Sequence, residues 1–300
     1  MDFGRLSDVS SVDFTLPPDP ERNAVLLNSR STGKAPQVWL GCPIWGEKAW
    51  AGLIYPKDAR EKDFLKYYGR QFNSIELNTT YYRIPTPQTV ENWAAAVPDN
   101  FRFCPKLPQE ISHTRQLLGS EALTEAFCIA VQHFGQKLGT TFLQLPPHFG
   151  PQKFGVLRSY LENFPAEIPL AVEFREENWF RGNALKEAVM LLEELNITAV
   201  ITDTAGRRDV LHQRLTTTSA FIRFTANDLH PTDFPRTDAW TAQLQKWLNG
   251  GLETIYFFVH SPSHALMPKL VRYAAEKLNT ISGIQLQSCK FLEEEQPSLF

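Results

Sequence analysis

The segment LAVEFREENWF, residues 170–180, joins a strand that should be buried to a run of charged side chains. Three apolar residues are followed by Glu173, Phe174 and Arg175, and Trp179 stands near the end of the segment. Because side chains alternate between the two faces of a strand, Glu173 and Arg175 share one face and Phe174 takes the other. One face is therefore apolar and the other is charged, so the fold must place a polar space beside this strand.

Short apolar or β-branched runs like this one recur along the chain and alternate with helix-like patterns. The predicted strands are 37–42, 73–78, 100–106, 140–145, 169–174, 197–202, 219–224 and 254–259, and the predicted helices are 58–71, 86–96, 120–138, 152–163, 183–195, 237–249 and 263–279. Such alternation indicates parallel strands joined by right-handed crossovers. Eight units in 300 residues favour the α/β class with a single closed (β/α)8 TIM barrel over an open sheet. The sixth unit is weak, because the stretch after Asp203 is short for a covering helix.

Two segments lie outside this rhythm. Residues 1–36 are polar and contain Pro17, Pro18 and Pro20, which predicts an N-terminal extension that drapes over the body or is partly disordered. The barrel should occupy residues 37–282, and residues 283–300 should form a short C-terminal tail with few apolar positions to bury.

Composition excludes several classes of protein. The net charge of −3 provides no global basic field for nucleic acid, so any such binding needs a local patch. The four cysteines form no closely spaced pair and the first residues do not resemble a signal peptide, which indicates a reducing, cytoplasmic setting. No run approaches the roughly 18 apolar residues of a membrane helix, so we expect no membrane partner.

The fold predicts where the functional residues should meet, because active sites of such barrels lie at the C-terminal ends of the strands. Side-chain alternation directs polar residues from most strands to that mouth: Glu76, Asn78, Lys106, Gln144, Glu173, Arg175, Asp203, Arg223 and His260. These charges could form a self-compensating ion network, since buried charges persist only when paired. They could equally bind a ligand. Lys106, Arg175 and Arg223 together suit a phosphate or a carboxylate.

Aromatic residues crowd the loops that should surround the mouth. A rim on which a sugar or nucleobase stacks could be formed by Trp45, Trp50, Tyr55, Tyr81, Tyr82 and Trp179, with Asn78, Gln144 and His260 as further contacts. The alternative is that these rings only pack the loops and close the top of the barrel.

Two other kinds of site remain open. Glu76, Glu173, Asp203 and His260, with His113 or His148, could bind a divalent metal that activates water. However, no compact metal-binding motif is present and the interior Lys and Arg oppose a cation, so we expect no cofactor. Paired carboxylates among Glu76, Glu173 and Asp203 could instead hydrolyse a glycosidic bond, although this signal is weak.

The last residues, EEEQPSLF, suggest a partner. Gln296–Phe300 resembles the short peptide by which bacterial DNA enzymes dock on the sliding clamp. A solvated tail with a chance ending is the alternative, because short motifs carry a high false-positive risk.

Several longer motifs resemble one family. GCPIW (41–45), IELNTTYYRIP (75–85), FRFCPK (101–106), LQLPPHF (143–149) and AVEFREENW (171–179) are similar, in matching order, to the DUF72 or YecE-like family, over roughly residues 38–280. The resemblance implies a TIM barrel and assigns no reaction. Glu176 stands where the family usually has a histidine, so the resemblance supplies no metal ligand there.

The leading prediction is an enzyme that acts on an anionic, phosphate-bearing substrate at the barrel mouth, in nucleic-acid maintenance. Lys106, Arg175 and Arg223 would hold the anion, and Glu173, Asp203 or Glu76 would serve in catalysis. The alternatives are a non-enzymatic module that binds an anion or the clamp, and a carbohydrate-active hydrolase.

Overall fold

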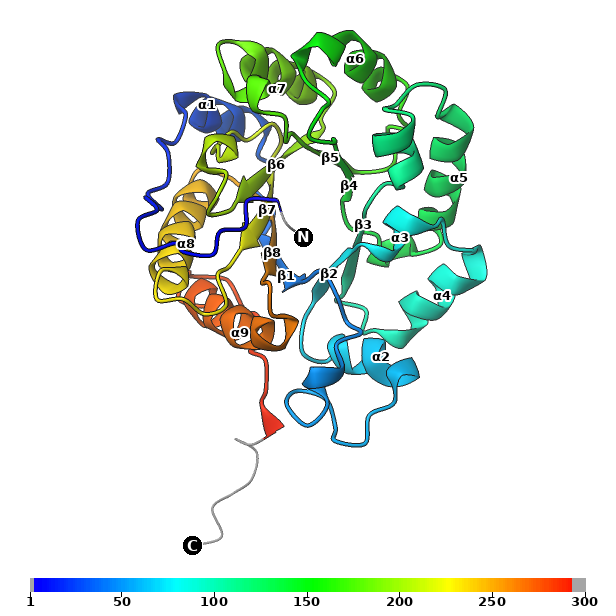
Figure 1. Ribbon diagram of the computed structural model, residues 1–300, viewed down its shortest axis with the longest axis vertical. Helices are drawn as coiled ribbons and strands as arrows, with labels where there is room; N and C mark the ends of the chain where they lie inside the picture. Colours follow the sequence, from blue (N-terminus) through cyan, green and yellow to red (C-terminus); the bar gives the residue numbers. More distant parts are fainter. Residues whose placement is uncertain (1–2, 293–300) are drawn as a thin grey trace, which may run out of the picture.

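The computed structural model describes residues 3–292 and confirms the predicted (β/α)8 barrel (Figure 1). The parallel strands of the ring are β1 (Gln37–Cys42), β2 (Ser74–Leu77), β3 (Arg102–Pro105), β4 (Thr141–Gln144), β5 (Leu170–Glu173), β6 (Thr198–Asp203), β7 (Ser219–Thr225) and β8 (Thr254–His260). They are hydrogen-bonded in the order β3-β2-β1-β8-β7-β6-β5-β4. The predicted strand segments and the observed strands therefore coincide to within two residues.

The ring is completed between β3 and β4 by a small number of contacts. The Leu107 N–H donates to the Phe142 carbonyl at 2.9 Å, and the Gly139 N–H donates to the Phe103 carbonyl at 2.7 Å. Lys106 faces Phe142 across this junction in an isolated parallel bridge. We call the junction the β3–β4 seam.

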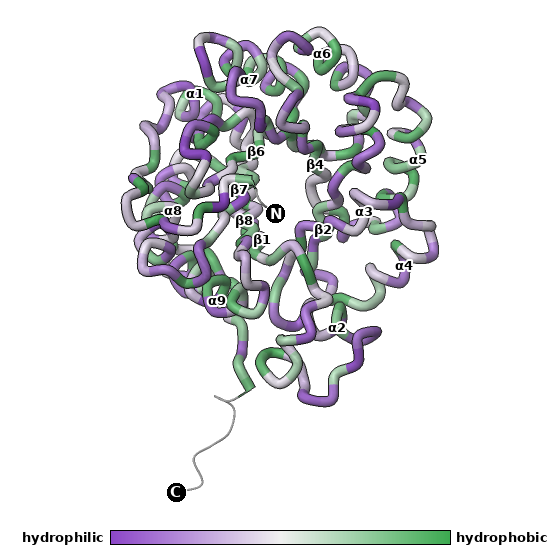
Figure 2. The backbone as a smooth tube through the Cα atoms, viewed as in Figure 1, coloured by the Kyte–Doolittle hydropathy of each residue, from purple (hydrophilic) through white to green (hydrophobic). Residues whose placement is uncertain are grey.

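Helices surround the ring on its outside (Figure 1). They are α1 (Glu21–Arg30), α2 (Phe64–Tyr68), α3 (Thr79–Tyr82), α4 (Pro87–Ala96), α5 (Glu121–Gln132), α6 (Phe154–Glu162), α7 (Ala184–Glu194), α8 (Asp233–Asn249) and α9 (Met267–Leu278). Helix α4 begins as the sequence suggests, with Pro87 in its first turn and the Thr86 hydroxyl accepting from the Thr89 N–H. Figure 2 shows hydrophobic and hydrophilic stretches mixed along the outer helices, as expected for helices with one buried face.

The sixth unit has no covering helix of its own in the described chain, and a helix from the N-terminal extension takes that place. Between β6 and β7 the described chain forms only a short 3₁₀ turn, Arg208–Val210. Helix α1 of the N-terminal extension lies beside α7 and α8 and covers this part of the ring (Figure 1). The Leu215 N–H donates to the Asn23 side-chain oxygen at 2.9 Å, and Leu26 and Leu27 are buried. The extension thus supplies the helix that the sixth unit lacks.

The first described residues run across the mouth of the barrel. The Gly4 carbonyl accepts from the Gly206 N–H at 2.8 Å and from the Thr204 hydroxyl at 3.0 Å. Gly4 has a φ of +70°, and a Cβ there would lie 2.4 Å from the Thr204 methyl carbon, so only glycine fits this contact. We call residues 3–9 the mouth segment.

The C-terminal region is partly packed against the barrel. Ile284, Cys289 and Phe291 are buried, and the Leu292 N–H donates to the Leu53 carbonyl at 3.0 Å. The expectation that the tail from residue 283 buries little is therefore wrong for residues 283–292. The predicted clamp motif, Gln296–Phe300, lies outside the described residues.

Membrane insertion finds no support in the helices. Within residues 3–292, none combines the length and the apolar character needed to cross a bilayer.

Candidate functional site

The interior of the barrel has an apolar layer beneath a charged one. Inward side chains form a separate hydrophobic cluster in the bore: Trp39, Cys104, Phe142, Ala171, Val200, Phe221, Tyr256 and Phe258. Two residues further along their strands, toward the C-terminal ends, come Lys106, Gln144, Glu173, Arg223 and His260. Strand alternation therefore places a plane of polar groups directly above a dry core.

Arg223 is the centre of this plane. Its Nε and Nη2 donate to the two oxygens of Glu76 at 2.8 and 2.9 Å, and its Nη1 donates to Glu173 at 2.7 Å. All three side chains are almost fully buried. One guanidinium on β7 thus ties the carboxylate of β2 to that of β5 across the bore.

The two carboxylates have further partners on either side. Glu76 accepts from the Asn78 amide at 2.9 Å and lies 2.9 Å from Nε2 of His260. Glu173 accepts from Nε of Arg175 at 2.8 Å, from the Gln144 amide at 2.7 Å and from the Thr202 hydroxyl at 3.1 Å.

Lys106 differs from the other cations. Its ammonium group donates to Oε1 of Gln144 at 2.8 Å and lies 4.1 Å from the centre of the Tyr81 ring. Among the described residues it makes no salt bridge, although only 4% of the residue is exposed. A buried lysine held by an amide and an aromatic ring lacks the compensation that Arg223 has.

Both carboxylates are held ionised. Burial alone would raise the pKa of Glu173, but Arg175 and Arg223 outweigh it and lower the pKa to about 2. Burial likewise acts on Glu76, and there Arg223 and His260 prevail and hold the pKa well below its usual range. Neither carboxyl group can therefore donate a proton near neutral pH.

The pKa values of two basic groups of the plane, Lys106 and His260, are lowered as well, which favours their uncharged forms. Burial, helped by the neighbouring charge of Arg223, lowers the pKa of Lys106 to about 7. Burial also lowers the pKa of His260, although Glu76 opposes the shift. Lys106 is thus a group of this plane that titrates near neutrality.

Asp203 is not part of the site, which corrects the sequence prediction. Strand β6 extends through Asp203, and the inward side chain at its end is Thr202. Asp203 points outward, where Nη2 of Arg236 donates to it at 2.8 Å and the Trp240 indole N–H donates at 2.8 Å. An error of one residue in the strand end reverses the face, so this buried carboxylate joins β6 to α8 instead.

The predicted aromatic rim is only partly present. Trp179 is buried and its indole N–H donates to the Phe149 carbonyl at 2.6 Å, so it packs the outside of the barrel and cannot stack a ligand at the mouth. Trp45 is half-buried with its ring edge-on to Trp93. Tyr82 is 73% exposed and lines the mouth cavity.

Tyr81 and His113 lie together beside Lys106, a proximity that the sequence does not predict. The rings of Tyr81 and His113 lie 5.4 Å apart, edge to face, with Tyr81 against Lys106. His113 lies in a π-helical turn, Glu110–Thr114, followed by Gln116 and Leu117 at φ values of +48° and +74°. Irregular turns and positive φ values at residues other than glycine are concentrated at functional sites. Sequence periodicity carries no signal for either.

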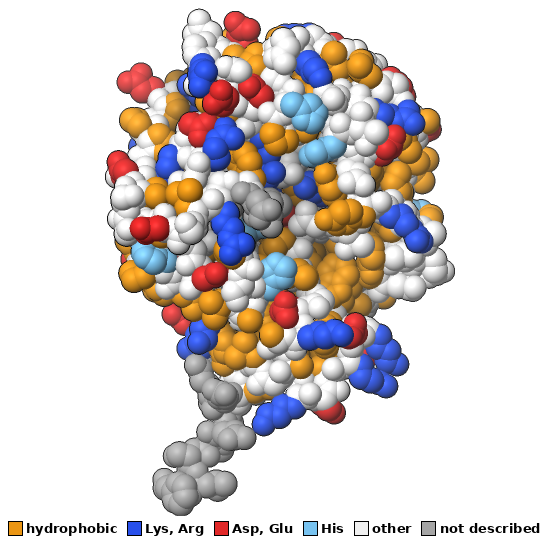
Figure 3. Space-filling model, in the orientation of Figure 1, with side chains coloured by type: hydrophobic (Ala, Val, Ile, Leu, Met, Phe, Trp, Pro, Cys, Tyr) orange, Lys and Arg blue, Asp and Glu red, His pale blue; other side chains and the backbone are white. Residues whose placement is uncertain are grey.

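A cavity of about 930 Å³ opens at the mouth. Its walls are the mouth segment on one side and, on the other, Asn78, Tyr82, His260 and the loops after β7 and β8. In the β7 loop, Asp228 and Leu229 have φ values of +56° and +63°, and Asp228 accepts from the Ser261 hydroxyl at 2.6 Å. Figure 3 shows histidine and basic side chains around the middle of this face, with hydrophobic side chains beside them.

The mouth segment also touches the charged plane. The Phe3 ring centre lies 4.3 Å from the Arg175 guanidinium carbon and 5.0 Å from that of Arg207. Such contacts between a cation and a ring are favourable when partly desolvated. The segment therefore forms one wall of the cavity and lies directly over Arg175.

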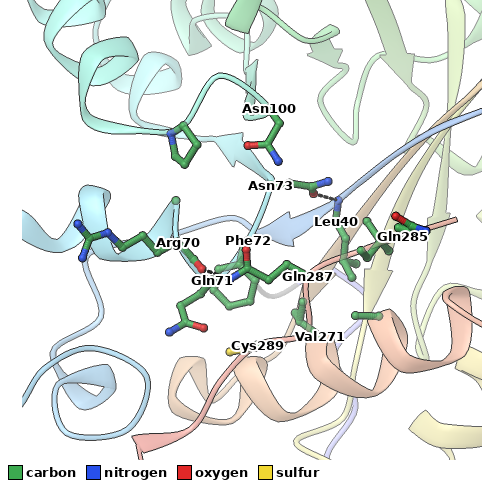
Figure 4. Close-up of a pocket in the computed structure, with 14 residues that line it drawn as sticks. Leu40, Arg70, Gln71, Phe72, Asn73, Asn100, Val271, Gln285, Gln287 and Cys289 are labelled. Carbon is green, nitrogen blue, oxygen red and sulfur yellow. Dashed lines mark hydrogen bonds between the residues drawn. The ribbon is translucent and has the colours of Figure 1, made fainter.

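A second cavity, of about 260 Å³, lies at the opposite end of the barrel (Figure 4). It is lined by the segments before β2 and β3, by α9 and by residues 285–289. Two of its amides hold the surrounding backbone: Asn73 accepts from the Leu40 N–H at 2.8 Å (Figure 4), and Gln71 accepts from the Lys290 N–H at 2.9 Å. This cavity lies between packed structural segments, and the catalytic candidates are at the other end.

The geometry offers little to a metal. In the described part of the chain, no three His, Cys, Asp or Glu side chains lie close enough together to hold an ion. Glu76 and His260 are in contact, but Arg223 occupies the position where a cation would have to lie.

These features define a class: a (β/α)8 barrel whose mouth contains a buried network of carboxylates and arginines, with a lysine that has no carboxylate partner among residues 3–292. The profile of the family described as "Protein of unknown function DUF72" matches residues 39–292, and the chain belongs to this family. It is 30% identical over 260 residues to the UPF0759 protein YecE of Escherichia coli K12, covering 80% of this chain and 92% of that protein. The UPF0759 protein YunF of Bacillus subtilis is 28% identical over 152 residues, covering 48% of this chain and 52% of YunF.

Solved structures agree in fold. A DUF72 family protein from Enterococcus faecalis superposes with a TM-score of 0.65 at 20% identity, covering 85% of this chain and 99% of that one. Another from Thermotoga maritima gives 0.63 at 23% identity, with coverages of 81% and 99%. The resemblance seen in the motifs is thus confirmed, and at these identities the structures support the fold alone.

Proposed function

We propose that the barrel mouth is the active site of an enzyme that acts on a small anionic substrate bearing a phosphate or a carboxylate. One observation carries the proposal. Among the described residues, Lys106 is buried without a carboxylate partner, whereas Arg175 and Arg223 beside it form ion pairs with Glu173 and Glu76. A buried ammonium group without a counter-charge is costly, and a bound anion would compensate it.

A purely structural network would be expected to balance its charges internally. Here Lys106 has no carboxylate partner among the described residues, and it lies at the end of the barrel where such folds place their sites. The mouth cavity of about 930 Å³, which meets the plane at His260 and Asn78, is in the range of small-molecule sites.

The roles of the residues follow from their ionisation. Glu76 and Glu173 position the arginines and are weak bases, because their pKa values are low. Lys106, with a pKa of about 7, suits proton transfer at neutral pH better than the carboxylates first considered for it. This assignment moves the catalytic role from Glu173 to Lys106.

The carbohydrate-hydrolase alternative has less support. Glycoside hydrolysis needs one carboxyl group with a raised pKa to protonate the leaving group. Both carboxylates of the plane have lowered pKa values and share Arg223. The suggested role in nucleic-acid maintenance depends on Gln296–Phe300 and stays a prediction.

The test is calorimetric titration of phosphate, sulfate and acetate into the protein at pH 6, where Lys106 is protonated. We expect millimolar or tighter binding, weakened at least tenfold in Lys106→Met, which keeps the length of the side chain and removes its charge. Lys66→Met on the exposed side of α2 makes the same change in charge and should bind as the wild type does. Absence of binding of all three anions to the wild type would remove the anion site.

An anion-binding module without catalysis is the remaining alternative. It predicts the same titration but no chemical change in any anionic substrate, whereas the enzyme proposal requires turnover that is lost in Lys106→Met.

A further inference from the structure

We infer that Lys106 is a nucleophilic amine that forms an imine with the carbonyl group of an anionic substrate, the simplest class being 2-oxo acids. The inference deepens the proposed function, because it requires the same anionic ligand at the same mouth. It adds a covalent role for a residue that the proposed function uses to hold the anion and to transfer a proton.

The geometry isolates the amine. Lys106 follows β3 directly, and its Nζ is held by one hydrogen bond to Gln144 Oε1, at 2.8 Å. Because this amide oxygen can only accept, the nitrogen keeps its lone pair for another direction when it is neutral. The Tyr81 ring covers one side at 4.1 Å and only 4% of the residue is exposed, so the amine is shielded from bulk solvent.

The surroundings favour the uncharged form. The side chain is buried, lacks a salt bridge among the described residues and shares the plane with two arginines. Desolvation and neighbouring cations are the two means by which proteins produce reactive lysines. With a pKa of about 7, roughly half of the Lys106 side chains are neutral at pH 7.

A lysine used only to hold an anion would be arranged differently. Arginine is always charged and offers a planar fork for phosphate or carboxylate, and the plane already contains Arg175 and Arg223. A lysine with a pKa of about 7 holds an anion in its protonated form, and its neutral form is a nucleophile. The arrangement instead combines cations that can hold a carboxylate with an adjacent amine that can attack a carbonyl carbon.

The chemistry balances without a further reactant. The neutral amine adds to the carbonyl carbon, and the carbinolamine loses water after taking up one proton from solvent. The product is a protonated imine, with a new C=N bond replacing the C=O bond. His113, whose pKa burial and the charge of Lys106 lower to about 4, adds no positive charge beside it at neutral pH.

The experiment traps the imine by reduction. The protein is incubated with glyoxylate and sodium cyanoborohydride, and peptide mapping locates carboxymethyl groups on lysine. At pH 7 the neutral fraction of Lys106 exceeds that of a lysine in a model peptide by a factor on the order of 10³, so we expect Lys106 to be modified much faster than the exposed reference residue Lys66. Modification of Lys106 should rise with pH and level off above about 7. Lys106→Met should lose this adduct and Lys66→Met should keep it.

A second variant tests whether the mouth segment keeps glyoxylate from reaching Lys106. Phe3→Ala removes the ring that lies over Arg175 and widens the mouth. Modification of Lys106 in either the wild type or Phe3→Ala supports the inference. If Lys106 reacts no faster than Lys66 in both proteins, it is overturned.

The outcome also separates this inference from the proposed function. Anion binding without a Lys106 adduct would remove the imine and leave the anion site. Failure of both measurements would remove both, and an adduct without binding of simple anions would confine the site to carbonyl compounds.

Discussion

Glu173→Gln tests whether the charged plane also stabilises the fold. The substitution keeps the shape of a side chain that is fully buried and removes the charge shared by Arg175 and Arg223, at 2.8 and 2.7 Å. The glutamine amide would point a donor at one of two guanidinium groups. Breaking a buried ion pair by removing one partner costs about 3–5 kcal/mol of unfolding free energy.

The pKa of Glu173 gives a second, independent value for this loss of unfolding free energy. A carboxyl group whose pKa falls from 4.5 to about 2 on folding stabilises the native state by about 3 kcal/mol when it is ionised. Because the folded pKa is the lower one, this stabilisation is complete above about pH 4.5 and is lost as the pH falls toward 2. The wild type and Glu173→Gln should therefore differ by about 3 kcal/mol at pH 7 and converge in acid.

The assay is urea denaturation followed by tryptophan fluorescence between pH 3 and pH 8. Glu177→Gln is the matched control, since it makes the same change four residues away at an exposed pair with Arg181 and should cost less than about 1 kcal/mol. If Glu173→Gln unfolds at the same urea concentration as Glu177→Gln at pH 7, Glu173 does not stabilise the plane and the reasoning fails.

Three further outcomes are expected. Anion affinity should be constant below pH 6 and fall about tenfold per pH unit above 7, because binding requires protonated Lys106; calorimetry should show no such fall in Lys106→Arg. Asp203→Asn should cost about 3 kcal/mol in urea denaturation yet leave phosphate binding intact, since that carboxylate holds Arg236 outside the barrel; weakened binding without loss of stability would contradict this. A labelled 290–300 peptide should bind the host's sliding clamp with micromolar affinity in fluorescence anisotropy, and Leu299→Ala with Phe300→Ala should abolish it; equal binding by that variant would remove the clamp hypothesis.

Most of the fold followed from sequence because its signals are local. Each strand is a short apolar run, and the alternation of side chains correctly placed Glu76, Lys106, Glu173 and Arg223 on the inner face. The same rule failed at Asp203, because the exact end of β6 depends on its pairing with β7, where Asp203 lies opposite Phe224. The alternation rule assigns a side chain to the correct face only when the end of the strand is known to the residue.

Long-range contacts were beyond the sequence. Nothing in the polar residues 21–30 indicates that they fill the place of the sixth helix, because that depends on a gap in the chain almost two hundred residues later. The position of Phe3 over Arg175 is similarly invisible, and so is the turn that brings His113 to Tyr81. These contacts form the walls of the mouth. The sequence therefore predicts most residues of the charged plane but not the segments that surround it.

The β3–β4 seam has a consequence for motion. Strands elsewhere in the ring are joined by regular ladders, whereas the seam depends on a few backbone hydrogen bonds around Phe103 and Phe142. Sparse hydrogen bonding lowers the free energy of local opening, so amides here should exchange with deuterium before those of β7 and β8. Lys106 and Gln144 lie on opposite sides of this seam. Local opening of the seam would break the hydrogen bond between Lys106 and Gln144 and admit water to the amine. The rate at which Lys106 exchanges its proton with solvent would then depend on how often the seam opens.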